Sequence, residues 1–307
     1  MNNSEIENLK NSFLKKIELK LFFRGLRKNE ILEGIDTIRG ELLERGFSIY
    51  EDFDEKVEYD FMEKNLGEKL VDFINPICRY ANKNGTEILI ASDCVQITDK
   101  IENYKSIKKY TGIFTLLIMA LKKVSGYFVP MKMYVRKVNI CYLRELEHLN
   151  EYFSQMVFPE YMFKNELDMK EVIFSDKNIR LNKEEVNVEF NTQMQFGEAY
   201  NEKKHTSEEL YQIILDYIVY VDDSQIIKNS LLEQADFDTY LERMNNMLDD
   251  IYLKSLTRDF LVRLCNRNFS DKKIVGVTPN EQNINQNSNK HKVLNKMLKK
   301  REKGGRK

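Results

Sequence analysis

Two polar residues, Arg136 and Asn139, stand three positions apart in the mostly apolar residues 131–142. The Val, Ile and Tyr content and the alternation of this stretch predict a strand, on which the two side chains point to opposite sides. A guanidinium carries five donors and an amide carries both donors and acceptors, so either group could bind a ligand. Buried polar groups nevertheless need partners. The favoured interpretation is structural, with each side chain tying a neighbouring segment to this strand.

Three acidic residues lie near the end of another apolar stretch, and in a nuclease such carboxylates could hold a divalent ion. Asp216 and Asp222 are six positions apart, and Asp223 follows. No further acid or lysine stands at a matching spacing, so we interpret these residues as the solvated end of a strand.

Other candidate catalytic residues do not form complete motifs. Arg144 and His148 are one residue too close for the arginine–histidine pair of helical ribonucleases. Ser92, Asp93 and Cys94 lack a glycine elbow, and no Gly-rich phosphate loop occurs in the chain. The sequence therefore predicts no catalytic residue, no cofactor and no metal site.

The 307 residues suffice for one large domain or two medium ones. No run of 18 apolar residues predicts a membrane span, and the polar first residues predict no signal peptide, so the expected location is the cytoplasm. The four cysteines are far apart, which argues against a disulfide framework and a zinc knuckle. They are Cys78, Cys94, Cys141 and Cys265.

The charge of the chain is unevenly distributed, because residues 290–307 hold nine of its 48 Lys and Arg residues and one of its 49 acidic residues. A basic segment after an acidic body could bind nucleic acid phosphates, an acidic partner or the body itself, or it could be a solvated end. Its cations are Lys290, Lys292, Lys296, Lys299, Lys300, Arg301, Lys303, Arg306 and Lys307.

Hydrophobic periodicity predicts an α+β fold made of two loosely repeated halves of ferredoxin-like type, with antiparallel sheets packed by amphipathic helices. The predicted halves are residues 1–155 and 156–277, followed by a flexible basic tail, 278–307. Strands are predicted at 16–24, 47–53, 56–61, 87–98, 131–142, 172–174, 179–181, 186–196 and 211–221. Helices are predicted at 31–43, 104–124, 143–153, 238–267 and, in the tail, 290–302, and a short helix that ends near Pro76 is predicted within residues 66–79.

Two of these predictions rest on specific patterns. Residues 186–196 alternate strictly between apolar and polar types, which predicts a strand with one wet side. Residues 211–221 also suit a helix preceded by a capping box, Thr206 and Glu209, but their β-branched and aromatic content favours a strand.

The segment Val135-Arg136-Lys137-Val138-Asn139-Ile140 resembles the central Leu-Arg-Tyr-Ile-Asn signature of an uncharacterised, sporadically distributed bacterial protein family. The resemblance covers about residues 17–265. Supporting similarities lie at residues 92–93, 149–153, 214–218 and 247–261. Lys137 replaces the usual aromatic residue, the family's proline-rich opening is missing, and the basic tail is additional.

The resemblance implies a role in mobile elements, defence against phage or toxin–antitoxin modules. Together with the incomplete catalytic motifs, it leads us to expect a non-catalytic binding or regulatory protein that has a protein partner. The alternative is a nucleic-acid-binding protein or nuclease that holds phosphates with the tail. In that alternative Lys108, Lys109, Lys122 and Lys123 assist the tail.

Overall fold

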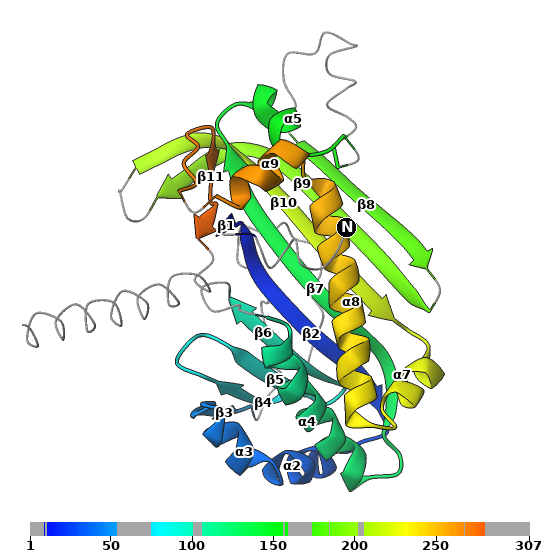
Figure 1. The fold of residues 1–307 in the computed structure, drawn as a ribbon. Coiled ribbons are helices and arrows are strands. Elements are labelled where there is room, and N and C mark those ends of the chain that lie inside the picture. The colour runs from blue at the N-terminus through cyan, green and yellow to red at the C-terminus, as the bar shows by residue number, and fades with distance from the viewer. Residues whose placement is uncertain are drawn as a thin grey trace, which may run out of the picture.

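The structure is a computed structural model that describes residues 9–53, 75–100, 106–158, 174–201, 206–266 and 268–279, apart from residues 10, 156 and 184. These residues form an α+β fold in which helices pack on a large antiparallel sheet (Figure 1). The predicted α+β class and antiparallel pairing are therefore confirmed. The predictions for residues 56–61, 66–74, 172–173 and 280–307, which include all but the first two residues of the predicted tail, lie outside the described residues.

The strand predicted at residues 131–142 is β7, and it is paired along both of its edges. It pairs with β2 on one side and with β10 on the other, and β11 continues the β2 side. The order in the sheet is β3-β4-β5-β6-β2-β7-β10-β9-β8. The strands are β2 (Leu14–Arg24), β3 (Ile49–Asp52), β4 (Pro76–Ala81), β5 (Glu87–Ala91), β6 (Cys94–Lys100), β7 (Val129–Leu143), β8 (Phe174–Lys183), β9 (Val186–Asn201), β10 (Thr206–Val221) and β11 (Ile274–Val275).

One continuous sheet contains the strands of both predicted halves. The pairing of β7 with β10 runs from Met133 opposite Val221 to Leu143 opposite Tyr211. The two predicted halves therefore share one sheet, and ferredoxin-like repeated halves are not confirmed. The physical reason is that β7 offers backbone hydrogen bonds along both edges, so a strand from the second half completes the sheet of the first. The boundary at residue 155 stays a prediction.

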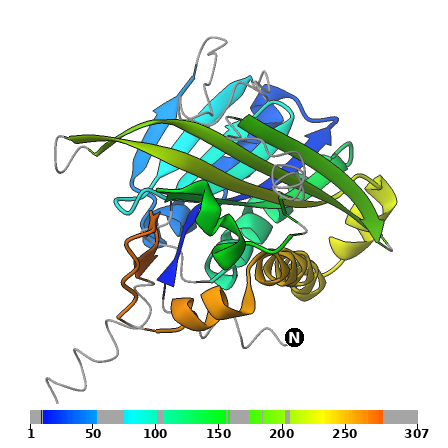
Figure 2. The same ribbon diagram turned by 90° about the horizontal axis from the view of Figure 1, so that it is seen from above.

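Helices cover one side of this sheet. Figure 2 shows the long strands β9 and β10 above the helices, and α4 and α8 lie side by side beneath the sheet (Figures 1 and 2). The helices are α2 (Lys28–Asp36), α3 (Arg39–Glu44), α4 (Lys108–Val124), α5 (Leu149–Tyr152), α7 (Ser224–Ser230), α8 (Gln234–Ser255) and α9 (Arg258–Leu264), with a 3₁₀ turn, η2, at Leu146–His148. None of the described helices is long and apolar enough to cross a membrane.

The main core lies between the sheet and these helices, because alternate residues of each strand are apolar. Leu19 of β2, Val135 of β7 and Leu215 of β10 are fully buried against residues such as Phe114 of α4 and Leu241 of α8. We call this the helix side of the sheet and the opposite surface the polar side.

Several predicted elements are divided in the structure. The strand predicted at 87–98 is the hairpin β5–β6, which turns at Ser92 and Asp93. The helix predicted at 31–43 is divided into α2 and α3. The helix predicted at 238–267 ends at Ser255 and restarts as α9, because the Thr257 hydroxyl accepts a hydrogen bond from the Phe260 amide and caps the new helix. The short helix predicted within residues 66–79 is expected to end near Pro76, and β4 begins at that residue.

The two short end strands of the described chain pair with each other. β1 (Asn11–Ser12) is antiparallel to β12 (Thr278–Pro279). The Asn11 side-chain amide also donates to the carbonyls of Leu264 and Asn266, at 3.1 and 2.6 Å. The C-terminal end of the described chain is thus fixed beside the start of β2, next to α9.

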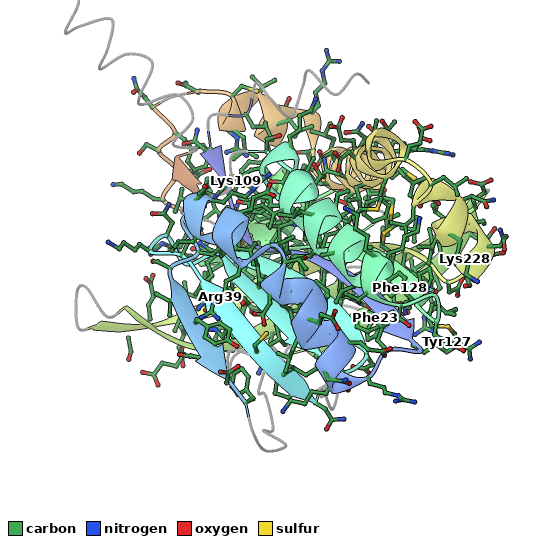
Figure 3. All side chains as sticks on the ribbon, turned by 90° about the horizontal axis from the view of Figure 1, so that it is seen from below. Phe23, Arg39, Lys109, Tyr127, Phe128 and Lys228 are labelled. Carbon is green, nitrogen blue, oxygen red and sulfur yellow. The ribbon has the colours of Figure 1, made fainter. Side chains whose placement is uncertain are left out.

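Gly25 occupies a position at the end of β2 that only glycine fits. Its φ is +94°, and a Cβ atom there would lie 1.9 Å from the carbonyl oxygen of Tyr127. The rings of Phe23 and Phe128, 5.5 Å apart, hold this turn together, and Figure 3 shows them gathered with Tyr127, away from Lys109 at the other end of α4. Gly25→Ala is expected to lower the unfolding free energy by roughly 2 kcal/mol, measured by urea denaturation.

The matched control for this substitution is Gly126→Ala. Gly126 lies in the loop on which Gly25 packs, its φ is not positive, and a Cβ atom there would meet nothing within 4 Å. This control should change the unfolding free energy by less than about 0.5 kcal/mol. Equal effects at the two glycines would contradict the close approach at Gly25.

Candidate functional site: the polar side of the sheet

Arg136 and Asn139 lie on opposite sides of β7, as predicted. Arg136 is on the polar side and forms two parallel hydrogen bonds with Asp216 of β10, from Nε to Oδ1 at 2.8 Å and from Nη2 to Oδ2 at 2.7 Å. The side chains are 21% and 12% exposed. Burial lowers the pKa of Arg136, but the charge and hydrogen bonds of Asp216 outweigh it, and the net pKa is raised. This pair cross-links two central strands.

Glu18 extends the same charge cluster onto β2, in register with Arg136. It is 3% exposed, pairs with Lys16 Nζ at 2.7 Å and accepts a hydrogen bond from the Tyr134 hydroxyl. Burial raises the pKa of Glu18, but the charges of Lys16 and Arg136 and the two hydrogen bonds lower it to about 2. We call Lys16, Glu18, Tyr134, Arg136 and Asp216 the charge cluster.

The depressed pKa of Glu18 makes the stability of the protein depend on acid pH. The pKa falls from 4.5 to about 2 on folding, so this carboxylate stabilises the folded state above about pH 5 and loses that effect as the pH falls towards 2. Glu18→Gln should remove about 3 kcal/mol at pH 7 and flatten the loss of stability between pH 5 and 2.

The pH dependence is checked by urea denaturation at a series of pH values. Glu44→Gln provides the control, because Glu44 is an exposed carboxylate on α3. If the Glu18→Gln protein lost stability with acid as steeply as the wild type, Glu18 would not be the group that titrates.

On the helix side, β7 is held by two further polar contacts. Asn139 Nδ2 donates to the carbonyl of Leu215 at 3.4 Å. Lys137 forms a buried ion pair with Asp249 of α8, and Asn245 donates to the other oxygen of that carboxylate at 2.9 Å. The predicted structural role of both signature residues is consistent with these contacts, since each binds a neighbouring segment.

The three acidic residues considered as metal ligands make different contacts. Asp216 holds Arg136, whereas the carboxylate of Asp222 accepts a hydrogen bond from Asn187 at 3.1 Å. Asp223 caps α7 by accepting from the amides of Gln225 and Ile226, at 2.7 and 3.2 Å. Within the described ranges no three His, Cys, Asp or Glu side chains gather closely enough to hold a metal ion.

Other predicted candidates also make structural contacts. Arg144 pairs with Glu208 and donates to the carbonyl of Lys272 at 2.6 Å, while His148 lies between Glu145 and Glu151. Ser92 and Asp93 form the turn of the β5–β6 hairpin. Cys78, Cys94, Cys141 and Cys265 are free thiols. Arg144 and His148 thus bind different carboxylates.

Three of the four lysines considered for phosphate binding have protein partners. Lys108 pairs with Glu242 at 3.5 Å, and Lys109 lies 3.5 Å from the buried Asp99. Lys122 donates to the carbonyl of Leu231 at 2.7 Å. These contacts fix α4 to α8, β6 and the end of α7. Lys123 is exposed.

A surface that sequence reasoning did not single out lies beside the charge cluster, on the polar side of β8 and β9. The amide side chains of this surface, which we call the amide face, are Asn178, Asn182, Asn187, Asn191, Gln193 and Gln195. Asn178 donates to Asn191 and, at 2.9 Å, to Glu189, and Asn182 donates to Asn187 at 2.9 Å. The alternation of residues 186–196 predicts that one side of this strand faces solvent, but the pattern alone gives that side no function.

The amide face offers many hydrogen-bond donors and acceptors and little net charge. Gln193 is half-buried and Gln195 is exposed, and both lie beyond the internal Asn pairs. Such a surface can form hydrogen bonds with a polypeptide in the way that interface rims do. The scan against family models gives no match to this chain, and neither does the search of the curated proteins.

Proposed function

We propose that this chain is a non-catalytic binding or regulatory protein whose amide face contacts a protein partner. The observation that carries the proposal is the row of amide side chains on adjacent strands, which ends in the accessible Gln193 and Gln195. Because β9 pairs with β10 along most of its length, these amides project from a rigid sheet. A rigid, nearly neutral surface of hydrogen-bonding groups suits a protein partner better than a nucleic acid, which is a polyanion.

The charges of the polar side support this choice. Lys16 faces Glu18, Arg136 faces Asp216 and Arg180 faces Glu189, the last pair at 3.5 Å. Nucleic acid binding depends on cations that are free to replace the counterions of phosphates. Cations that already face carboxylates would have to give up those contacts to bind phosphates. This side of the sheet therefore favours a protein partner over a nucleic acid.

The biological setting of the proposal rests on the resemblance alone. A sporadically distributed bacterial family with a central Leu-Arg-Tyr-Ile-Asn signature suggests anti-phage defence or a toxin–antitoxin-like system, in which this protein would be the sensor or partner component. The cytoplasm is the expected location in that setting. The partner is then another component of the same system.

The test compares two double variants of the full-length protein as baits in the native host. Gln193→Arg/Gln195→Arg places two charges on the amide face. The control, Gln225→Arg/Asn229→Arg, places two charges at exposed amide positions of α7. Nuclease-treated lysates are used, and bound proteins are quantified by isotope-labelled mass spectrometry.

The proposal expects a protein that the wild type and the α7 variant retain and that the amide-face variant loses by about tenfold or more, since a charge buried in a neutral interface costs more than 1.4 kcal/mol. Equal recovery of all proteins by both variants would refute the role of the amide face. Degradation of RNA or DNA by the purified protein alone would refute a non-catalytic function.

The second candidate, nucleic acid binding or cleavage, is favoured by the nine cations of residues 290–307. It predicts salt-dependent recovery of RNA or DNA, in samples without nuclease, that disappears when the chain ends at Thr278. Recovery that is unchanged by this truncation would exclude the tail as the binding element.

A further inference from the structure

Three segments that are far apart in the sequence meet at the end of the molecule where β2 ends and β7 begins. Gly25, just after β2, packs closely against the backbone carbonyl of Tyr127. The last turn of α4 reaches the end of α7, because Lys122 Nζ donates to the carbonyl of Leu231 at 2.7 Å. The three segments that form this surface are residues 24–28, 122–132 and 228–233.

This surface is strongly cationic, although the chain outside residues 290–307 contains more acidic than basic residues. The three segments hold seven Lys and Arg residues and one acidic residue, Glu233. Lys132 is half-buried, with its Nζ 4.3 Å from the ring centroid of Tyr220, whereas the other six cations are exposed. We call these six the cationic end: Arg24, Arg27, Lys28, Lys122, Lys123 and Lys228.

The charges of the cationic end are not neutralised by carboxylates of the described ranges. None of its six side chains forms an ion pair with a described acidic residue, and the contact of Lys122 is to a carbonyl. Glu30, which follows on α2, accepts a hydrogen bond from the backbone amide of Arg27 at 2.8 Å instead. Free cations replace the counterions of phosphates, so this end has the property that the paired cations of the polar side lack.

Tyr127 lies where two groups of cations meet. Its side chain is 76% exposed, while the neighbouring rings of Phe23 and Phe128, 5.5 Å apart, hold its loop in place. One group of cations follows β2 beside Gly25, and the other lies on the last turns of α4 and α7. Figure 3 shows Tyr127 and Lys228 at the same end of the molecule, away from Lys109. A fixed, exposed ring with cations around it can stack on an unpaired base while the cations hold the phosphates.

We propose that the cationic end binds single-stranded nucleic acid, with Tyr127 stacked on a base and the surrounding Lys and Arg side chains on the phosphates. The bases of a duplex are already stacked on one another and would leave this ring unused. An acidic polypeptide would leave it unused as well. A lipid surface needs a larger apolar area than the exposed side chains of Tyr127 and Leu232 offer. This inference goes beyond the function proposed for the amide face and uses neither that face nor the tail.

The test is fluorescence anisotropy of labelled oligo(dT) and oligo(U) of about 20 nucleotides with the full-length protein, between about 50 and 200 mM salt. Arg24→Gln/Lys123→Gln/Lys228→Gln should weaken binding by about tenfold or more. It should also reduce the slope of log affinity against log salt by about 2, because three phosphate contacts are lost. Tyr127→Ala should weaken binding by about tenfold and leave this slope unchanged, since stacking releases no counterion.

The matched control, Lys83→Gln/Lys254→Gln/Lys272→Gln, removes the same charge from exposed lysines of the β4–β5 turn, the end of α8 and the segment before β11. These positions lie towards the opposite end of the sheet, so the control should keep the wild-type affinity within about twofold. Circular dichroism checks that all variants are folded.

Equal losses in the two triple variants, with no effect of Tyr127→Ala, would overturn the cationic end and assign the binding to the tail. A wild type that binds neither oligonucleotide would also overturn it. Binding of polyglutamate or of phosphatidylglycerol vesicles in place of the oligonucleotides would then assign this surface to an acidic polypeptide or to a membrane.

Discussion

Arg136→Met is expected to lower the unfolding free energy by about 3 kcal/mol, because it leaves the largely buried carboxylate of Asp216 without its two strongest donors. Methionine keeps much of the side-chain volume, so the loss of unfolding free energy measures charge pairing more than packing. The measurement is the urea unfolding curve, followed by circular dichroism. A loss below about 1 kcal/mol would show that Arg136 is not a cross-link between β7 and β10.

A double-mutant cycle separates pairing from burial. Asp216→Leu in the Arg136→Met protein should recover most of the lost free energy, because replacing a buried ion pair by apolar side chains is often close to neutral. The single variant Asp216→Leu should be destabilised, since it removes both carboxylate hydrogen bonds of Arg136 and leaves only the nearby charge of Glu18 to compensate the guanidinium. Additive losses in the double variant would contradict direct coupling of the two side chains.

Phe13→Ala is expected to have the largest effect of any single substitution considered, a loss of about 4 kcal/mol. Phe13 is fully buried, and its ring centroid lies 6.2 Å from that of Phe153, 5.5 Å from Tyr252 and 6.1 Å from Phe260. These rings come from the α5 end, α8 and α9, so one side chain joins three helical segments to the start of β2. The cavity left by alanine would separate them.

The thermal midpoint and the urea midpoint both report this loss. Tyr127→Ala removes an aromatic side chain that is 76% exposed, and it should change stability by less than about 0.5 kcal/mol. If Phe13→Ala were as mild as this control, the aromatic contacts would not be holding the C-terminal helices to the sheet.

Local sequence patterns predicted the strands at the centre of the sheet well. β7 was expected from its alternation, and residues 211–221 were expected as a strand because of their β-branched content, although their spacing also suited a helix. Both expectations succeeded because the composition and the pairing environment agree. The break between α8 and α9 was missed, since the apolar spacing continues through Leu256. Thr257 caps the new helix, and the bridge of Leu256 with Phe153, a tertiary contact, also lies at the break.

Long-range pairing was not accessible from local patterns. The β7–β10 contact joins residues about 80 positions apart, and neither sequence identifies the strand with which it pairs. Arg136 and Asp216 were each recognised as candidates, but their pairing was not predicted. Glu18 is not identified from the sequence, because a charged residue in an alternating strand is expected to face solvent. In the structure it is buried beside Lys16 and Tyr134, which bind its carboxylate.

The central claim is a division of roles, in which the charge cluster holds the sheet together and the amide face binds a protein. Its most direct test is the affinity of purified variants for the recovered partner, measured by calorimetry well below their thermal midpoints. Gln193→Arg/Gln195→Arg should weaken binding by about tenfold or more with little change in the thermal midpoint. Arg136→Met should lower the thermal midpoint and leave the affinity of the folded protein unchanged. The opposite pattern, with affinity lost in the Arg136→Met protein and kept in the amide-face variant, would contradict the account and move the binding site to Arg136.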